Sequence, residues 1–288
     1  MSQLTIIDSQ VHVWKASTPD RPWPADAIAP QRDVPLEVPE LSDRMTRAGV
    51  SAAVLLGPTW EGARNDYVLS AAAAEPERFG ALCRFATGDP AAVETLAQWR
   101  ECRGMVGIRM SLNRGDVDGA VMRATSSGFF TAAARFGVPI SIYAPGRYEL
   151  YEQLAQAHPE LRITVDHAAI ETHDRPLADA VLPLLELSRY PGIAVKASAL
   201  PCFVTEPYPF PSISEAVYRL VSAFGAERVF WGSDLSRLPV PYEQLVDVFV
   251  SHTSQLGDRE RQLVLGRGLA EWLDWKAVLP SAAEPTGI

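Results

Sequence analysis

The stretch Ile6-Ile7-Asp8-Ser9-Gln10-Val11-His12-Val13-Trp14 begins as an apolar strand and runs directly into the pattern Asp-x-Gln-x-His-x-Trp. Residues two apart on a strand point to the same side, so the two imidazoles of a His-x-His pair here could coordinate one metal ion. Gln10 stands where the first imidazole would be, and a neutral amide is a poor ligand for such an ion. No Gly-x-Gly-x-x-Gly turn follows the strand, which argues against a doubly wound dinucleotide-binding sheet.

Short apolar strands alternate with amphipathic helices along the rest of the chain. The strands are too apolar to be half-solvated, as parallel strands covered on both faces require. Helical crossovers between such strands favour an α/β fold, a single-domain (β/α)8 TIM barrel, with a doubly wound open sheet as the alternative. We predict the barrel over residues 1–279 and a flexible tail over 280–288. The predicted strands are 4–8, 51–56, 79–85, 105–109, 138–143, 162–166, 193–196 and 228–231, and the predicted helices include 66–74, 90–100, 129–136, 148–157, 176–187, 213–224 and 242–250.

The composition excludes several classes of protein. With 288 residues and a net charge of -9, the chain offers no basic surface for nucleic acid. Its three Cys residues are too few for a disulfide framework or a Cys-rich zinc site. The sequence has no signal-like N-terminus and no apolar segment of membrane-spanning length, so we expect a cytoplasmic protein without membrane contacts.

Ionisable side chains follow the predicted strands where each strand ends. In a barrel of this type, active-site groups sit at the carboxyl ends of the strands. His12 lies just past the first strand, His167 follows the sixth and Asp234 follows the eighth. Each residue alone has a structural interpretation, but together two imidazoles and a carboxylate make a metal site or an acid–base set. His173, in the loop after the sixth strand, is a weaker candidate for the same mouth.

A second group of residues at strand ends favours binding of an anion. Arg84, Arg109 and Lys196 end the third, fourth and seventh strands. An arginine at such a mouth can hold a carboxylate with two parallel hydrogen bonds, although an internal ion pair is an equal alternative for Arg109. Aromatic residues that could wall the same pocket, or simply fill the core, are Tyr143, Trp14 and Trp60.

Four segments together resemble the amidohydrolase-2 family, the TIM-barrel hydrolases of the amidohydrolase superfamily. They span nearly the whole chain in the family's order, and within the family the sequence is most similar to the branch of sugar-lactone and dicarboxylate-pyrone lactonases. A second branch holds decarboxylases of aromatic and muconate-type acids. The segments are 7–14, 165–168, 230–234 and 266–273, where Arg267 stands at a position usually occupied by Asn.

The resemblance implies site residues position by position. The second His of the family's His-x-His motif matches His12, the sixth-strand His matches His167 and the eighth-strand Asp matches Asp234. Gln10 replaces the first His, and Tyr143 stands where many members carry a further His. Some lactonases of this branch work without a required metal. We therefore expect either no required cofactor or one weakly bound Zn or Mn ion, held by His12, His167 and Asp234.

The resulting hypothesis is hydrolysis of a lactone or related cyclic ester of a carboxylated or sugar-derived molecule. Asp234 would act as the general base on water, and His12 and His167 would polarise the carbonyl. Gln10 would donate its amide NH₂ to the same oxygen. Arg109, Arg84 or Lys196 would hold the anionic part of the substrate.

Two alternatives stay open at this stage. One is a metal-assisted decarboxylase of an aromatic or muconate-type acid, and the other is a catalytically inactive barrel that binds a small ligand. In each case we expect a small-molecule partner, and a homo-oligomer remains open. Specificity would reside in the loops 19–39 and 199–211, because loops after the strands carry substrate selection in such barrels.

Overall fold

Eight parallel strands pair in sequence order around a barrel. The structure is a computed structural model that describes residues 4–171 and 175–278, so the predicted tail at 280–288 and His173 lie outside the described residues. The prediction of a (β/α)8 barrel is confirmed, and the doubly wound sheet is excluded. The strands are β1 (Ile7–His12), β2 (Ala52–Leu56), β3 (Phe79–Cys83), β4 (Met105–Ser111), β5 (Ile140–Tyr143), β6 (Ile163–Val165), β7 (Ile193–Ser198) and β8 (Val229–Gly232).

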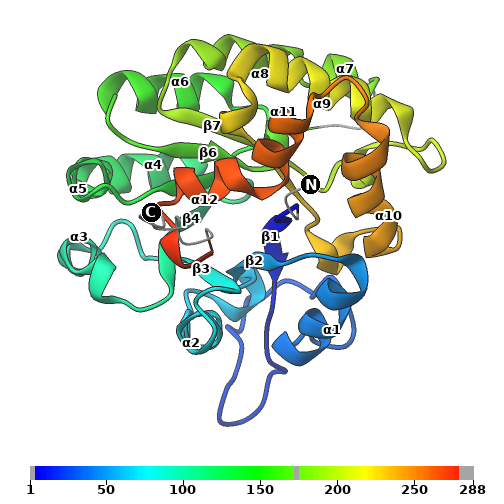
Figure 1. The fold of residues 1–288 in the computed structure, drawn as a ribbon. Helices are drawn as coiled ribbons and strands as arrows, with labels where there is room; N and C mark the ends of the chain where they lie inside the picture. Colours follow the sequence, from blue (N-terminus) through cyan, green and yellow to red (C-terminus); the bar gives the residue numbers. More distant parts are fainter. Residues whose placement is uncertain (1–3, 172–174, 279–288) are drawn as a thin grey trace, which may run out of the picture.

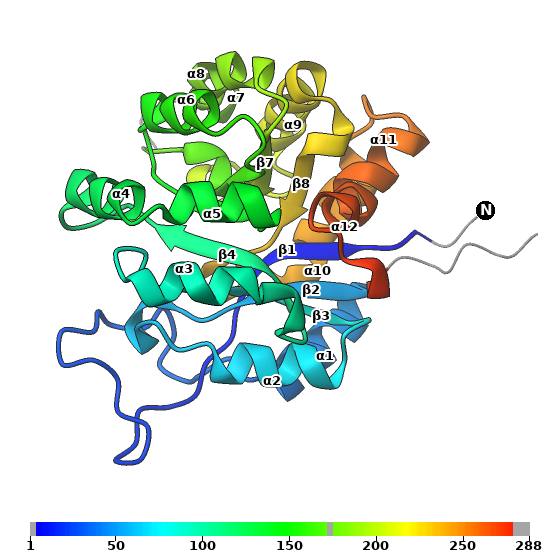
Figure 2. The same cartoon turned by 90° about the vertical axis from the view of Figure 1, so that its left-hand side faces the viewer.

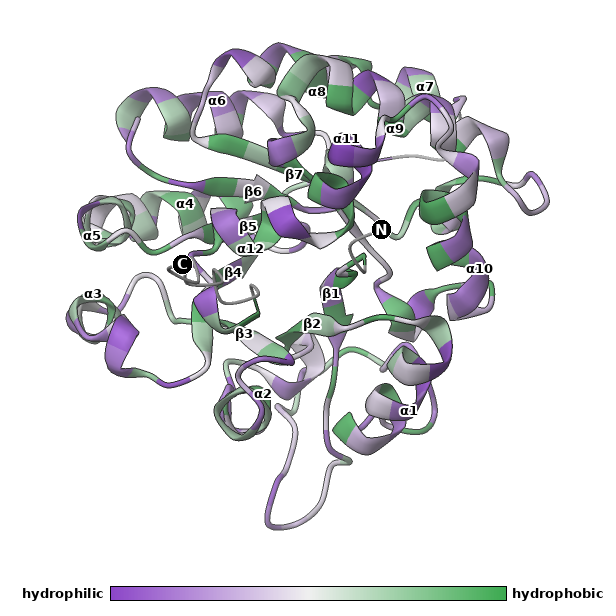
Figure 3. Ribbon diagram, in the orientation of Figure 1, coloured by the Kyte–Doolittle hydropathy of each residue, from purple (hydrophilic) through white to green (hydrophobic). Residues whose placement is uncertain are grey.

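Helices surround the strands and hold them in the parallel order (Figure 1). Hydrophobic positions follow the strands and the inward faces of the helices, and hydrophilic positions face outward (Figure 3). Local signals set the ends: α1 has a proline in its first turn and stops at Gly49, whose φ of 71° suits a residue without Cβ. The helices are α1 (Val38–Ala48), α2 (Asp66–Ala74), α3 (Pro90–Ala97), α4 (Val117–Ser126), α5 (Phe129–Phe136), α6 (Tyr148–Ala157), α7 (Leu177–Ala180), α8 (Leu182–Leu185), α9 (Pro211–Phe224), α10 (Tyr242–Asp247), α11 (Asp258–Gln262) and α12 (Gly268–Trp272).

Two predicted elements differ most from the structure, and one helix was not predicted. The first strand runs from Ile7 to His12 rather than over 4–8, because its polar residues are buried and extend the strand to the mouth. The predicted helix 176–187 is divided into α7 and α8, and Pro183 lies in the first turn of the second piece. Helix α4 was not predicted; the Asp116 side chain caps it by accepting a hydrogen bond from the Gly119 N–H.

The seam between β8 and β1 is closed by a buried carboxylate. Within the described residues no strand ladder joins the two strands, and one backbone hydrogen bond of 2.9 Å runs from Asp234 N to Gln10 O. The Asp8 carboxylate instead accepts hydrogen bonds from the backbone N–H groups of Ser233 (2.9 Å) and Gln10 (3.0 Å) and from the hydroxyls of Ser233 and Tyr242. Gly232 lies so close that an added Cβ would be 2.4 Å from the Ser9 hydroxyl.

The two ends of the barrel differ. At the amino-terminal end, Leu269, Ala270 and Leu273 of the closing helical segment join Ile7 and Phe230 in an apolar cluster. The opposite end carries the long segment between β1 and α1, which extends away from α12 (Figure 2). The carboxyl ends of the strands and this segment together define the open mouth.

Candidate active site

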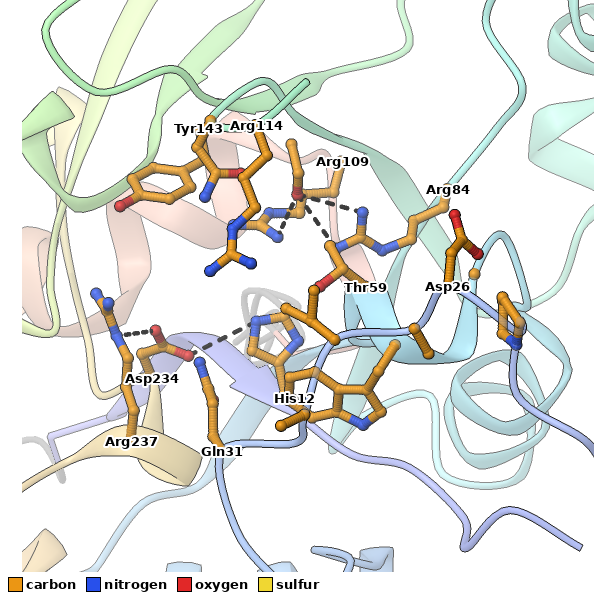
Figure 4. Close-up of a pocket in the computed structure, with 18 of the residues that line it drawn as sticks. His12, Asp26, Gln31, Thr59, Arg84, Arg109, Arg114, Tyr143, Asp234 and Arg237 are labelled. Atoms are coloured by element: carbon orange, nitrogen blue, oxygen red, sulfur yellow. Dashed lines mark hydrogen bonds and ion pairs between the residues drawn. The ribbon is translucent and has the colours of Figure 1, made fainter. Parts of the chain in front are cut away.

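A cavity of about 570 Å³ opens at the carboxyl ends of the strands. Its walls come from strand ends and from the segment between β1 and α1, and charged side chains face one another across it (Figure 4). The lining residues among those described are His12, Pro24, Asp26, Ala27, Ile28, Ala29, Gln31, Thr59, Trp60, Gly62, Arg84, Arg109, Ser111, Asn113, Arg114, Tyr143, His167, Asp234 and Arg237.

His12, His167 and Asp234 converge at one side of this cavity. Nε2 of His12 lies 3.6 Å from Oδ1 of Asp234, and Nε2 of His167 lies 3.6 Å from Oδ2. All three side chains are almost fully buried. Nδ1 of His167 is 2.8 Å from the Ser198 hydroxyl, whereas Nδ1 of His12 has no hydrogen-bond partner among the described residues. The carboxylate is therefore flanked by one imidazole on each oxygen.

The backbone turns sharply where these residues leave the strands. His167 and Asp234 have φ values of 53° and 50°, in the left-handed region that residues with a Cβ rarely adopt. Ala168 and Ala199 share this conformation at the ends of β6 and β7. Such strain persists only where the surroundings over-determine it, and it concentrates at functional sites.

Burial sets the protonation of the cluster. It lowers the pKa of His12 to about 3 and that of His167 to about 4, against the opposing pull of the Asp234 carboxylate. Burial alone would raise the pKa of Asp234. The His167 and His12 rings and the guanidinium groups of Arg237 and Arg109 hold that pKa below its ordinary value. Near neutral pH the site therefore contains two neutral imidazoles and one carboxylate.

Guanidinium groups gather on the facing wall. The Ser111 hydroxyl lies 2.8 Å from Nη1 of Arg109 and 3.2 Å from Nη1 of Arg84, so two cations share one neutral acceptor. Within the described ranges no carboxylate is within ion-pair distance of Arg84, and burial with the nearby Arg109 lowers the pKa of Arg84 to about 9. Arg114 lies on the same side in Figure 4. This wall has excess positive charge.

Beneath the cavity, a buried network links four strands. Asp166 accepts hydrogen bonds from Nε of Arg109 at 3.0 Å and from the Ser141 hydroxyl, and forms an ion pair with Nζ of Lys196 at 3.0 Å. Lys196 also donates to Oε1 of Gln10 at 2.8 Å. Although burial opposes ionisation, the two cations hold the pKa of Asp166 well below its usual range. The network fixes the positions of Arg109 and Gln10.

The structure brings seven of the sequence-predicted residues to the cavity wall and leaves three outside it. Trp60 packs edge-on against Trp14 at a centroid distance of 5.1 Å, and Trp14 itself is fully buried behind it. Gln10 and Lys196 face the buried network, so neither is placed to meet a substrate in this structure. The predicted residues at the wall are His12, His167, Asp234, Arg84, Arg109, Tyr143 and Trp60.

Sequence reasoning missed three residues of this region. Arg237 lies three residues after Asp234, and its Nε is 2.6 Å from Oδ2 of that carboxylate. Gln31 enters the cavity from the segment before α1, with its carbonyl oxygen accepting a hydrogen bond from Ser236. Asp166 immediately precedes His167 and holds the network below. The spacing Asp-x-x-Arg was a readable signal for Arg237, whereas nothing local in the sequence indicates that Gln31 folds back.

The residues present do not fit a divalent metal ion well. Among residues 4–171 and 175–278, no group of three or more His, Cys, Asp or Glu side chains is arranged to hold one. Oδ2 of Asp234 is already paired with a guanidinium, and four arginines line the described part of the cavity. The amide oxygen of Gln10 is engaged by Lys196. A cation would meet positive charge on both sides of the cavity.

Two sequence comparisons bear on this site. The family model described as Amidohydrolase matches residues 7–267. An L-fucono-1,5-lactonase from Burkholderia ambifaria is 28% identical over 245 residues, which is 81% of each chain. No helix in the described part of the chain is long and apolar enough to cross a membrane.

Solved structures share the fold at lower identity. An amidohydrolase from Burkholderia multivorans with bound zinc has a TM-score of 0.77 and 20% identity, covering 94% of this chain and 99% of its own. A candidate 2-pyrone-4,6-dicarboxylic acid hydrolase from Pseudomonas putida has a TM-score of 0.76 and 23% identity, covering 95% and 99%. A 5-carboxyvanillate decarboxylase from Sphingomonas paucimobilis has a TM-score of 0.67 and 17% identity, covering 94% and 99%.

Proposed function

Since this chain belongs to the amidohydrolase family and is an enzyme of the hydrolase type, we propose that it opens the lactone ring of a small carboxylated molecule. The observation that carries this proposal is the pairing of two clusters across one cavity. A neutral His pair with an ionised aspartate lies on one side, and a guanidinium wall lies on the other. The first can activate water, and the second can hold a carboxylate while this happens.

Asp234 is the general base in the proposed reaction. It is ionised near neutral pH, and Oδ1 has no hydrogen-bond partner among the described residues. A water molecule would give one proton to this oxygen as its own oxygen bonds to the lactone carbonyl carbon. The tetrahedral intermediate then breaks the ring C–O bond, and the departing ring oxygen takes the proton back from Asp234. The product is an open-chain hydroxy acid.

His12 and His167 are the proposed donors to the carbonyl oxygen. Neutral imidazole carries one N–H, and low pKa values keep both rings neutral rather than charged. Preorganised donors in a buried site stabilise the oxyanion of the intermediate without reorganisation. Gln10 is not proposed for this role, because its amide oxygen is engaged by Lys196 and its side chain does not line the described cavity.

Arg84, Arg109 and Arg114 are proposed to hold the substrate carboxylate. Arg109 is already paired with Asp166, but Arg84 has no carboxylate partner among the described residues. The two arginines share only the neutral Ser111 hydroxyl, so a substrate carboxylate there would supply the missing negative charge. Lys196 is removed from this list, because its ammonium is fully buried beneath the cavity floor. An uncharged sugar lactone, as in the name of the Burkholderia ambifaria relative, would leave this wall unsatisfied.

We also propose that turnover needs no metal. The proposal rests on the donor set: Gln10 bound to Lys196, Asp234 bound to Arg237, and an excess of arginine around the cavity. Activity after exhaustive chelation, together with elemental analysis of the same sample, tests it.

Decarboxylation is the second candidate, because a decarboxylase shares the fold and the guanidinium wall would also suit an aromatic acid. The deciding experiment incubates the enzyme with a panel of carboxylated and uncharged lactones and with aromatic carboxylic acids. Acid release without gas supports lactone hydrolysis. Carbon dioxide release from the acids supports the alternative, and ligand-dependent thermal stabilisation without turnover of any compound indicates a binding barrel.

A further inference from the structure

The two oxygens of the Asp234 carboxylate have different surroundings. Oδ2 lies 2.6 Å from Nε of Arg237, whereas Oδ1 has no hydrogen-bond partner among the described residues. His12 approaches Oδ1 and His167 approaches Oδ2, each at 3.6 Å, so the imidazoles alone do not distinguish the two oxygens. Arg237 is therefore the group that makes the carboxylate asymmetric.

Contacts other than the ion pair with the Asp234 carboxylate also hold Arg237 in place. Its backbone N–H donates to the Asp234 carbonyl at 3.0 Å within a short 3-10 helix, Leu235–Arg237. Its guanidinium carbon lies 5.5 Å from the centroid of the Phe203 ring, and its carbonyl accepts a contact from the Cys202 thiol at 3.5 Å. Segments after β7 and β8 thus fix both ends of the residue, and its side chain lines the cavity.

The ion pair also meets an electrostatic requirement. A carboxylate with a side chain 3% exposed is costly to keep charged without a nearby cation. The Nε atom of Arg109 is committed to Asp166, which leaves Arg237 as the guanidinium in direct contact with Asp234 in the described part of the chain. The contact is not aligned as a hydrogen bond, so Nε and Nη2 of Arg237 keep donor capacity.

We propose that Arg237 is the positioning residue of the catalytic carboxylate: its contact with Oδ2 of Asp234 orients the carboxylate so that Oδ1, which is buried and has no hydrogen-bond partner among the described residues, is left to accept the proton from water. This inference rests on the proposed lactone hydrolysis for its catalytic consequence. The geometric claim, that a guanidinium group binds next to Oδ2 of Asp234, depends only on contacts within the protein.

The test replaces Arg237 by Ala and adds the lost group back as methylguanidinium. We expect kcat on a carboxylated lactone to fall by about 10²-fold while KM changes by less than about threefold. Millimolar methylguanidinium should restore at least about a tenth of the lost rate, and Arg237→Lys should keep part of it. Arg267→Ala, which removes an exposed ion pair with Glu271, is the matched control and should change neither constant.

A rise in KM with kcat unchanged would overturn the proposal, because Arg237 would then be a binding residue. A loss of kcat that methylguanidinium does not restore would also overturn it. If Arg237→Ala does not fold, Arg237→Gln takes its place, with the same kinetic criteria. A substrate-free measurement separates this inference from the proposed function: methylguanidinium should raise the melting temperature of Arg237→Ala and not that of wild type. Should no lactone be hydrolysed by wild type, the proposed function fails, and the melting shift alone decides whether the guanidinium site exists.

Discussion

The ammonium group of Lys196 lies 2.8 Å from Oε1 of Gln10, so a charged side chain of β7 reaches β1 beneath the cavity floor. Both residues are almost completely buried, and the same ammonium is 3.0 Å from Asp166. A cation supplied by the protein thus already occupies the space next to Gln10. The position of this ammonium group therefore determines whether a substitution of Gln10 can create a metal site.

Gln10→His should not create a metal site. The new imidazole would stand beside the Lys196 ammonium, and a divalent ion there would be repelled by a fixed charge in a poorly hydrated environment. After incubation with zinc or manganese and dialysis, we expect elemental analysis to find less than about 0.1 equivalent of metal per chain. A tight structural zinc site would retain about one equivalent under the same conditions. The double variant Gln10→His with Lys196→Met lacks the ammonium group, so it tests whether this charge is what prevents metal binding. One equivalent of metal in the single variant would contradict this account.

Asp8→Ala should destabilise the barrel seam. Four donors from Gln10, Ser233 and Tyr242 converge on this buried carboxylate, and its removal leaves them without an acceptor. We expect the free energy of unfolding to fall by about 3 kcal/mol, as for other broken buried networks. Urea denaturation followed by tryptophan fluorescence measures it. Asp8→Asn, which keeps one acceptor oxygen, should lose less, and equal losses in both variants would refute the explanation.

The activity should be independent of pH across the neutral range. The pKa values of His12 (about 3) and His167 (about 4) are lowered by burial, and that of Asp234 is also below its ordinary value. As pH falls, the imidazoles gain protons and the carboxylate is neutralised, so kcat/KM should decline only below about pH 5 and stay flat to about pH 8. Rates are corrected for uncatalysed lactone opening. Burial raises the pKa of Asp8 to about 6, so an inflection near pH 6.5 that Asp8→Asn retains would show that one imidazole titrates normally.

Arg84→Met should separate charged from uncharged substrates. Arg84 shares a neutral hydroxyl with Arg109 and has no carboxylate partner in the described ranges, so its loss removes attraction for the substrate anion. We expect KM for a carboxylated lactone to rise by about 10- to 100-fold, with less than about threefold change for an uncharged lactone of the same ring size. Arg219→Met, which removes a surface charge near Glu215, is the control. Equal effects on both substrates would remove Arg84 from anion binding.

The positions of the active-site residues along the strands follow from the sequence to a useful extent. His12 is the last residue of β1, and His167 and Asp234 come just after β6 and β8, so the rule on strand ends located them. The same rule misplaced Lys196, and the His-x-His motif misplaced Gln10. Each lies two residues before the end of its strand, and inward-facing residues at that depth form a lower layer of packed side chains.

Residues brought in from outside the strands were harder to predict. Gln31 reaches the cavity because a long segment folds back over the mouth. Hydrophobic periodicity predicts helices and strands but does not predict where a loop folds back. Asp166 was predicted as the last residue of the sixth strand. A charged carboxylate there is stable only because Lys196 and Arg109 surround it, and these residues meet only when the barrel is closed. Partners far apart in sequence determine which polar residue faces the substrate.

Turnover of carboxylated lactones by exhaustively chelated protein, compared between wild type and Asp234→Asn, tests the central claim most directly. The substitution preserves shape and removes the charge that accepts the proton from water. We predict that metal-free wild type, verified by elemental analysis, opens the ring with undiminished kcat, and that Asp234→Asn folds normally but loses at least about 10³-fold in kcat. An Asp234→Asn variant with near-normal rates, or wild type that is inactive until zinc or manganese is restored, would contradict the account.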